Sequence, residues 1–231
     1  MRLRSYIEDH FPEAVRLWKG HKARHLRGKS MEEVFTGIYH RNEWRDSKTR
    51  SGTASTLLNT QAVRAELPGL LGSLGVRTLL DIPCGDFHWM KEVTLDLDRY
   101  IGADIVEELV TSNMKFMNDI RTFVKMDITC DTLPMVDLVL CRDCLIHFSF
   151  VDSFRAIENI KASGSRYLLM TTFTRENAKN IDIVTGQWRT LNLQQPPFDF
   201  PPPISLIHEG FKPGGGRYAD RCLGLWRIAD L

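Results

Sequence analysis

The chain has 231 residues and a formal net charge of +1, with 43% hydrophobic and 26% charged residues. This is the composition of a soluble globular protein with one sizeable core. No run of about 18 apolar residues is present to cross a membrane, and no apolar run follows the basic residues at positions 1–5, as a secretory signal would require. We therefore expect a cytoplasmic α/β protein.

The first 50 residues are basic, with 12 Lys and Arg against 7 Asp and Glu. Two interpretations stay open for this segment: a surface that meets RNA, an anionic lipid surface or an acidic substrate, or simply a solvated helix face. Residues 11–26 have an amphipathic pattern, and Ser30 begins a capping-box sequence that predicts a second helix. We expect residues 1–50 to form an N-terminal helical cap on a domain that spans residues 51–231.

Strands and helices alternate through the rest of the chain. A helix is expected over residues 56–67, ended by Pro68 and Gly69, and further helical stretches are expected around Trp89 and over residues 107–118 and 151–161. This alternation predicts a parallel sheet with right-handed crossovers. The seven expected strands cover residues 78–82, 100–104, 122–126, 136–141, 166–171, 204–207 and 222–228.

The turn after the first expected strand indicates a nucleotide-type cofactor. In an open α/β sheet this turn holds the polar part of the ligand, and an acid about 20 residues later binds the ribose. Here Gly85 lies between Asp81 and Asp86, and Asp104 has the position of the ribose-binding acid. Two carboxylates would repel the pyrophosphate of NAD but suit the ammonium and sulfonium of S-adenosylmethionine. The sequence therefore favours S-adenosylmethionine over NAD.

Residues 79–86 resemble the first motif of class I S-adenosylmethionine-dependent methyltransferases. Residues 102–104, 126–128 and 137–143 resemble the family's later motifs, so the likeness covers residues 51–173. It implies a Rossmann-like, seven-stranded, mostly parallel sheet with helices on both faces and one antiparallel strand near the end. One departure is that Pro83 and Phe87 stand where the family has its outer glycines. A weaker likeness points to a bacterial surface-glycan or small-molecule subgroup.

The resemblance also implies cofactor contacts. Asp81 and Gly85 are expected at the methionine moiety, Asp104 at the ribose and Asp127 at the adenine amino group. Plain structural roles, as strand-end caps and turn residues, are the alternative for these positions. The expected set is completed by residues next to these in sequence and by one after the fourth strand: Cys84, Asp86, Ile105, Ile128 and Arg142.

The candidate catalytic residues follow the fourth expected strand. Asp143 and His147 are four residues apart, which places them on one helix face if Asp143 opens a helix. A carboxylate beside an imidazole can fix its tautomer and raise its basicity. We expect His147 to be the general base, with Arg142 or Asp143 orienting the substrate. The alternative is that Asp143 is a helix N-cap and His147 a half-buried structural residue.

The connection over residues 176–203 is long and polar, and a lid and a packing arm are both open interpretations. It contains Gln-Pro-Pro-Phe at residues 195–198, which resembles a motif of amino-directed nucleic-acid methyltransferases but lies too late in the chain, so base methylation is disfavoured. Between and after the last strands, four further residues are candidates for the acceptor pocket or for an ordinary hairpin: His208, Glu209, Arg217 and Tyr218.

The leading hypothesis is methyl transfer from S-adenosylmethionine to a hydroxyl of a small polar or glycan-type acceptor. The alternatives are an RNA-binding or RNA-modifying protein, a NAD-dependent oxidoreductase and a cofactor-binding module without catalysis. Nucleic acid is disfavoured as a partner, and the sequence does not indicate an oligomeric state. No metal is expected, because Cys141, Cys144 and His147 lack a fourth ligand at suitable spacing for zinc.

Overall fold

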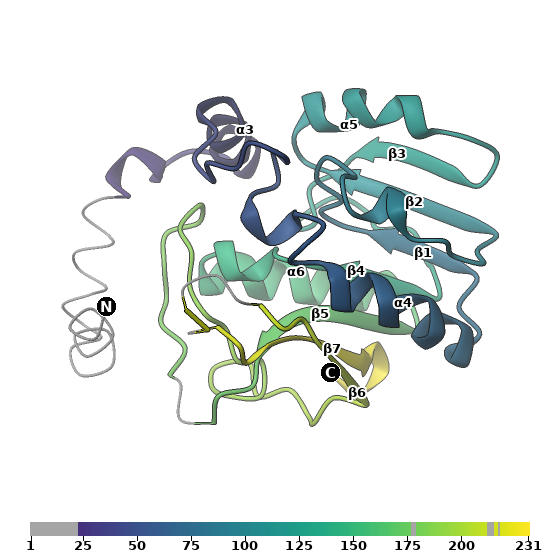
Figure 1. Cartoon of the computed structure of the whole chain (residues 1–231). Coiled ribbons are helices and arrows are strands. Elements are labelled where there is room, and N and C mark those ends of the chain that lie inside the picture. The colour runs from purple at the N-terminus through teal and green to yellow at the C-terminus, as the bar shows by residue number, and fades with distance from the viewer. Residues whose placement is uncertain (1–22, 177–178, 212–214, 217) are drawn as a thin grey trace.

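A seven-stranded sheet forms the centre of the molecule (Figure 1). The structure is a computed structural model and describes residues 23–176, 179–211, 215, 216 and 218–231. All seven expected strands are present, in the spatial order β3-β2-β1-β4-β5-β7-β6. Their bounds are β1 Thr78–Asp81, β2 Arg99–Asp104, β3 Arg121–Lys125, β4 Leu138–Cys141, β5 Tyr167–Phe173, β6 Ser205–His208 and β7 Arg221–Arg227.

The directions of the strands determine at which edge of the sheet a ligand can bind. Strands β3, β2, β1, β4 and β5 are mutually parallel, whereas β7 pairs antiparallel with both β5 and β6. The expected fold class, with one antiparallel strand near the end, is therefore confirmed. In the register of the central strands, Asp81 pairs with Gly102 and with Leu140, so β1, β2 and β4 all end at one edge of the sheet. Ligands of open α/β sheets bind at this edge.

Helices cover both faces of the sheet, which gives two hydrophobic cores. Helix α4 (Gln61–Leu74) and helix α5 (Glu107–Asn113) contribute to one core, and helix α6 (Phe150–Ala162) contributes to the other. Side chains of each strand alternate between the two, so that Leu79 joins the α4 core and Leu80 the α6 core. Figure 1 shows α4 and α6 on either side of the strands.

Helix α4 corrects one expectation, because Pro68 lies inside the helix and does not end it. The helix begins later, after Thr60, and continues to a left-handed cap at Gly75, whose N–H bonds the carbonyls of Leu71 and Gly72. Leu67 and Leu71 are one helical turn apart and almost fully buried against the sheet. The gain from burying both side chains outweighs the cost of a proline in the helix.

Helix α3 (Met31–Arg41) precedes the sheet domain and begins with the expected capping box, in which Ser30 and Glu33 bond each other's backbone N–H. It lies beyond the carboxyl ends of the strands (Figure 1). An exposed ion pair of Lys125 with Glu32 at 2.7 Å and a hydrogen bond between His40 and Glu108 at 2.5 Å connect it to the sheet region. The expected helix over residues 11–26 lies mostly outside the described residues, and the division into cap and domain stays a prediction.

Two connecting segments differ from expectation. The stretch around Trp89 forms only a 3-10 turn, Met90–Glu92, and the expected helix over residues 107–118 ends at Asn113, followed by a 3-10 turn. The described part of residues 174–204 forms neither helix nor strand. Its Leu191 and Leu193 are fully buried in the α6 core, so the segment packs against the sheet. Among the described residues, no helix is long and apolar enough to cross a membrane.

Candidate functional site

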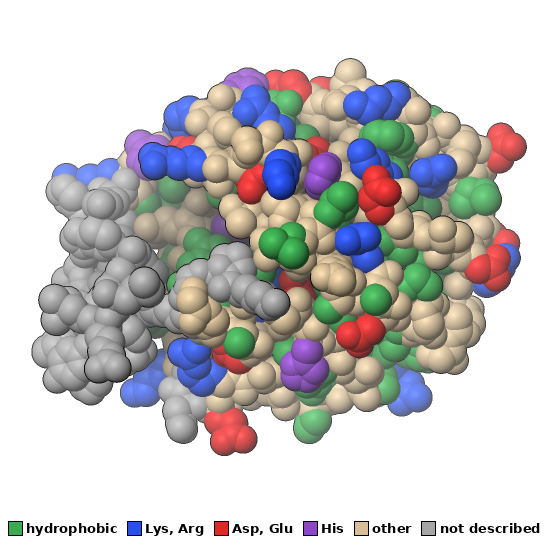
Figure 2. Space-filling model, in the orientation of Figure 1, with side chains coloured by type: hydrophobic (Ala, Val, Ile, Leu, Met, Phe, Trp, Pro, Cys, Tyr) green, Lys and Arg blue, Asp and Glu red, His purple; other side chains and the backbone are tan. Residues whose placement is uncertain are grey.

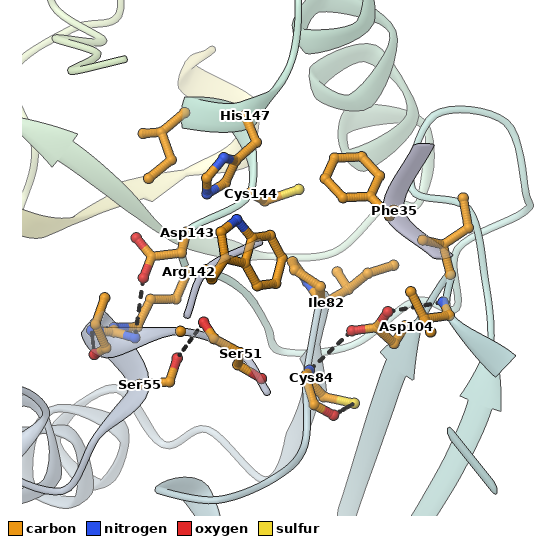
Figure 3. A pocket seen from close by; sticks show the side chains of 18 of the residues that line it. Phe35, Ser51, Ser55, Ile82, Cys84, Asp104, Arg142, Asp143, Cys144 and His147 are labelled. Carbon is orange, nitrogen blue, oxygen red and sulfur yellow. Dashed lines mark hydrogen bonds and ion pairs between the residues drawn. The ribbon is translucent and has the colours of Figure 1, made fainter. Parts of the chain in front are cut away.

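A cavity of about 380 Å³ opens at the carboxyl edge of the sheet. The ends of β1, β2 and β4 line it from the sheet, α3 and residues 51–55 line it from the N-terminal side, and the C-terminal segments contribute Trp188, Phe211, Tyr218 and Arg221. Figure 3 shows Asp104 and Cys84 on one side of this cavity and Arg142 and Asp143 on the other.

The acid at the end of β2 holds the turn after β1 in place. Asp104 accepts hydrogen bonds from the N–H of Gly85 and from the N–H of Val106, both at 3.0 Å. The amide of Asn113 donates to the Gly85 carbonyl at 2.8 Å. Gly85 has a φ of +58°, and a Cβ on it would overlap the hydroxyl of Ser51. The single retained glycine is thus required by both its conformation and its neighbour.

Asp86 has a different place from the one expected, since it does not line the cavity. Its carboxylate accepts from the backbone N–H of Arg50 at 2.8 Å and from the hydroxyl of Ser51 at 3.1 Å, and that hydroxyl accepts from the Asp86 N–H at 3.0 Å. In this structure Asp86 connects the turn after β1 to the N-terminal segment. The neighbouring acids and Cys84 do line the cavity.

Asp81 and Asp104 lie buried at the floor of the cavity, 2% and 5% exposed. Burial raises the pKa of Asp81 to about 7, against the opposing effect of a 2.6 Å hydrogen bond from the Tyr100 hydroxyl. Burial also raises the pKa of Asp104 to about 6, although backbone N–H groups stabilise its charged form. A cationic ligand would relieve both penalties, because it stabilises the ionised carboxylates.

The wall beside β2 and β3 is mostly apolar. Ile105 and Ile128 line it together with Asp127. One carboxylate oxygen of Asp127 accepts from the N–H of Thr129 at 2.8 Å and from its hydroxyl at 2.6 Å. The expected adenine-contacting segment therefore lies at the cavity, with its acid held in a local turn.

On the opposite side, four charged side chains form a buried network. Arg142 binds Glu209 at 2.6 Å and lies 3.4 Å from Asp143, and Arg221 binds Asp143 at 2.6 Å and Glu209 at 3.1 Å. Arg142 also donates to the carbonyl of Ala54 at 2.9 Å, which connects the network to the N-terminal segment. The two arginines and the two carboxylates compensate each other's charge.

Asp143 does not open a helix, which corrects the expectation from spacing and also its N-cap alternative. Its φ is +58°, and the following residues form a 3-10 turn, Leu145–His147, before Ser149 caps α6. Its backbone N–H donates to the hydroxyl of Thr171 at 2.9 Å. Burial raises the pKa of Asp143, but the charges of Arg221 and Arg142 outweigh burial, and the pKa lies below its usual range.

His147 lines the cavity together with Asp143, although the two are brought there by a turn and not by a helix face. Its Nδ1 lies 3.0 Å from the carbonyl of Gln187 and donates to it, because a carbonyl can only accept. The lone pair of the neutral ring is then on Nε2. Burial lowers the pKa of His147, against the opposing charge of Asp143, so the ring is neutral at pH 7.

Aromatic side chains surround His147 and the network, and among them Tyr218 is the one that the sequence analysis names for this site. The ring of Trp44 lies 5.5 Å from that of His147, and Trp188 packs edge-on against Tyr218 at 4.9 Å. Arg221 lies over the ring of Phe211 at 4.9 Å. Trp44 reaches the cavity from the turn after α3, Trp188 from the irregular segment 174–204, and Phe211 and Tyr218 from the connection between β6 and β7.

Two of the other four acceptor-pocket candidates lie at the cavity or in the network beside it. Tyr218 lines the cavity and Glu209 belongs to the buried network, but His208 is exposed and its Nδ1 lies 3.1 Å from the sulfur of Cys222, away from the cavity lining. Arg217 lies outside the described residues. Residues 1–22 of the basic N-terminal segment also lie outside the described residues, and RNA binding by that segment stays a prediction. On the face shown in Figure 2, Lys and Arg are interspersed with Asp and Glu.

No protein-family model matches the sequence, and no curated protein matches it. The structure is similar to magnesium protoporphyrin IX methyltransferase from Synechocystis PCC 6803 with bound S-adenosylmethionine, at a TM-score of 0.50 and 15% identity, over 67% of this chain and 82% of that one. It is also similar to DhpI in complex with S-adenosylhomocysteine, at a TM-score of 0.49 and 18% identity, over 69% of this chain and 81% of that one. The first similarity confirms that the fold is that of class I methyltransferases.

Proposed function

We propose that this chain, which has the fold of class I methyltransferases, binds S-adenosylmethionine and transfers its methyl group to a hydroxyl of a small polar or glycan-type acceptor. The observation that carries the proposal is the clamp at the sheet edge, where Asp104 at the end of β2 holds the turn after β1 through the N–H of Gly85. The clamp brings the expected ribose-binding acid to the turn that would hold the methionine moiety. Asp81 lies beside it in the same cavity.

The residues of this half of the cavity fit the cofactor. Each oxygen of Asp104 accepts one backbone hydrogen bond, and a carboxylate oxygen has capacity for a second, which ribose hydroxyls can use. Asp81 would compensate the positive charge of the methionine moiety, and Ile105 and Ile128 would contact the adenine ring, with Asp127 near its amino group. A pyrophosphate would meet only carboxylates there, which argues against NAD.

The other half of the cavity supports the chemistry. S-adenosylmethionine would supply a methyl group on a positively charged sulfur, so the protein has to align a nucleophile and accept one proton. His147 is the proposed base, since its Nδ1 is fixed by Gln187 and its Nε2 keeps a lone pair at neutral pH. Arg142 and Asp143 are proposed to orient the acceptor. A hydroxyl is the nucleophile that most needs such a base, because it is weakly nucleophilic while protonated.

Calorimetric titration tests the cofactor assignment. At pH 8 Asp104 is ionised, and we expect the protein to bind S-adenosylmethionine and S-adenosylhomocysteine, with Asp104→Ala lowering both affinities by at least about 10-fold through loss of charged hydrogen bonds. Glu66→Ala removes an exposed acid of α4 and should leave both affinities unchanged.

The Asp104 carboxylate also holds the β1 turn, so thermal unfolding of the same samples must show that the variant is folded at the titration temperature. No binding of either ligand by the wild-type protein would overturn the proposed function. Binding that persists unchanged in a folded Asp104→Ala protein would show that the ribose lies elsewhere.

A further inference from the structure

The backbone N–H groups in the turn after β1 are bonded within the protein. From residue 84 to residue 88 the hydrogen bonds run from Cys84 to the Ala103 carbonyl at 2.8 Å, from Gly85 to Asp104 at 3.0 Å, from Asp86 to the Ser51 hydroxyl at 3.0 Å, from Phe87 to the Cys84 carbonyl at 3.4 Å and from His88 to Asp86 at 3.3 Å. The turn therefore offers a ligand hydrogen-bond acceptors, namely carbonyls and nearby carboxylates. Such a turn suits a ligand group that donates hydrogen bonds, and binding then depends on where the acceptors point.

Asn113, the last residue of α5, holds one of these carbonyls. Its side-chain amide donates to the carbonyl of Gly85 at 2.8 Å and lies 3.7 Å from the sulfur of Cys84. Asp104 accepts from the N–H of the same glycine. Both polar backbone groups of Gly85 are thus bonded to side chains, one from β2 and one from α5. The orientation of this residue is therefore set by contacts from outside the turn.

The path of the turn is imposed by its surroundings. Gly85 and Phe87 have φ angles of +58° and +56°, and such a value is uncommon for a residue with a bulky side chain. The ring of Phe87 is buried and packs against Phe116 and Phe123, with ring centroids 5.3 and 5.1 Å away. Conformations of this kind persist where the surrounding structure holds them, and they are concentrated at binding sites. Loss of a contact such as that of Asn113 should let the turn relax.

The burial of Asn113 indicates a role besides stability. The residue is 1% exposed, and its Oδ1 accepts no hydrogen bond from the described residues. A buried polar atom without a partner destabilises the fold, and a leucine, which has the same branching, would avoid this cost. What the amide contributes in return is the hydrogen bond that it donates to Gly85.

We propose that Asn113 is a positioning residue of the cofactor site, which holds the turn after β1 in the geometry that receives the amino-acid part of S-adenosylmethionine. This inference rests on the proposed function and adds a residue to its site. Cys84 and Gly85 line the cavity and Asn113 does not, so Asn113 acts through these two residues. The proposed ribose contact belongs to Asp104, so loss of Asn113 should affect the amino-acid part of the ligand and spare the adenosine part.

Calorimetric titration with two ligands tests the proposal. S-adenosylhomocysteine has the amino-acid part, and methylthioadenosine keeps the adenosine and the sulfur but lacks it. Asn113→Leu should lower the affinity for S-adenosylhomocysteine by about 5- to 20-fold and that for methylthioadenosine by less than about 2-fold. Ser112→Ala, at an exposed position of the same helix, is the control and should change neither affinity.

A purely structural role predicts a different pattern. A fall of the same size for both ligands would mean that Asn113 only supports the fold, and unchanged affinities would mean that the turn does not need it. Either result overturns the proposal. Thermal unfolding must show that the variant is folded at the titration temperature, and Asn113→Ala, which removes the donor and adds no methyl group, replaces Asn113→Leu if that protein does not fold.

The wild-type protein supplies a second measurement that needs no variant. In the nuclear magnetic resonance spectrum of isotope-labelled protein, saturating S-adenosylhomocysteine should shift the side-chain amide signals of Asn113. Methylthioadenosine at the same occupancy should shift them much less, because it leaves the turn without a bound group. Equal shifts with both ligands, or no shift with either, would contradict the proposal.

Failure of this proposal can be told apart from failure of the proposed function. A wild-type protein that binds S-adenosylhomocysteine, with a folded Asn113 variant that keeps the wild-type ratio of the two affinities, overturns the role of Asn113 and leaves the cofactor assignment standing. A wild-type protein that does not bind S-adenosylhomocysteine overturns both.

Discussion

Replacement of Asp81 by asparagine should stabilise the protein, and the gain should grow with pH. Asp81 is 2% exposed, and burial raises its pKa from 3.8 to about 7. Because the pKa is raised, the folded protein keeps a proton on Asp81 between about pH 4 and pH 7, a range in which the unfolded chain has lost it. The wild-type protein therefore has its full stability, as far as Asp81 is concerned, below pH 4, and it loses this stability as the pH rises towards 7. Asn is uncharged and can still accept the hydrogen bond of Tyr100.

The magnitude follows from the two pKa values. Relative to a carboxyl whose pKa is 3.8 in both states, the raised pKa of Asp81 lowers the free energy of unfolding by about 2 kcal/mol at pH 5 and by about 4 kcal/mol at pH 8. The free-energy difference between Asp81→Asn and wild type should thus increase by about 2 to 3 kcal/mol between these pH values. Asp104 also has a raised pKa, but it is present in both proteins, and its own contribution largely cancels in the comparison.

The assay is urea-induced unfolding followed by tryptophan fluorescence at pH 5 and pH 8, with Glu66→Gln as the exposed control, for which no pH-dependent gain is expected. A gain that is equal at both pH values would show that Asp81 titrates normally, and a gain that shrinks with pH would contradict the sign of the argument. The same variant should bind S-adenosylmethionine more weakly at pH 8, because it lacks the charge proposed to face the methionine moiety.

Two further substitutions test the base and the turn. His147→Gln should lower kcat by roughly 100-fold or more. The wild-type rate should fall as the pH drops below 6.5, since burial lowers the pKa of His147, and the variant should lack this fall. A pH–rate profile that is the same in both proteins would exclude His147 as the base. Gly85→Ala should destabilise the fold by about 1 to 3 kcal/mol, because its Cβ would overlap the Ser51 hydroxyl at a φ of +58°. Combining it with Ser51→Gly should recover part of that loss in a urea titration, whereas Gly69→Ala, in open space on α4, should cause none. Full stability of Gly85→Ala alone would refute the steric argument.

The strands, and the position of Asp81, Gly85 and Asp104 at the cavity, could be predicted because their signals are local. Each strand is a short apolar run, and Asp81, Gly85 and Asp104 follow strand ends that meet at one edge. The α4 boundaries were wrong because burial of Leu67 and Leu71 is a tertiary effect that a local rule about proline does not contain. The partners of Asp86 could not be predicted for a similar reason, since they belong to a segment about 35 residues earlier, and its contact with a cofactor stays a prediction.

The opposite side of the cavity, with Asp143 and His147, could be predicted only in part. His147 and Asp143 were found from their residue types, but their geometry was wrong, because spacing alone cannot show a left-handed residue that interrupts a helix. The partners of the network, Glu209 and Arg221, come from the end of the chain and have no motif of their own. Pairings over such separations are decided by the sheet topology.

The buried network also orders the assembly of the site during folding. Strands β1, β2 and β4, with the turn held by Asp104, lie within 64 consecutive residues, Thr78–Cys141. Arg221 reaches Asp143 across 78 residues of chain and only after β7 has entered the sheet beside β5. Closing so long a loop costs entropy that local contacts do not repay, and contacts of this range form late. A nascent or partly folded chain would therefore have Asp104 and the turn after β1 in place before Arg221 and Glu209 complete the buried network on the other side of the cavity.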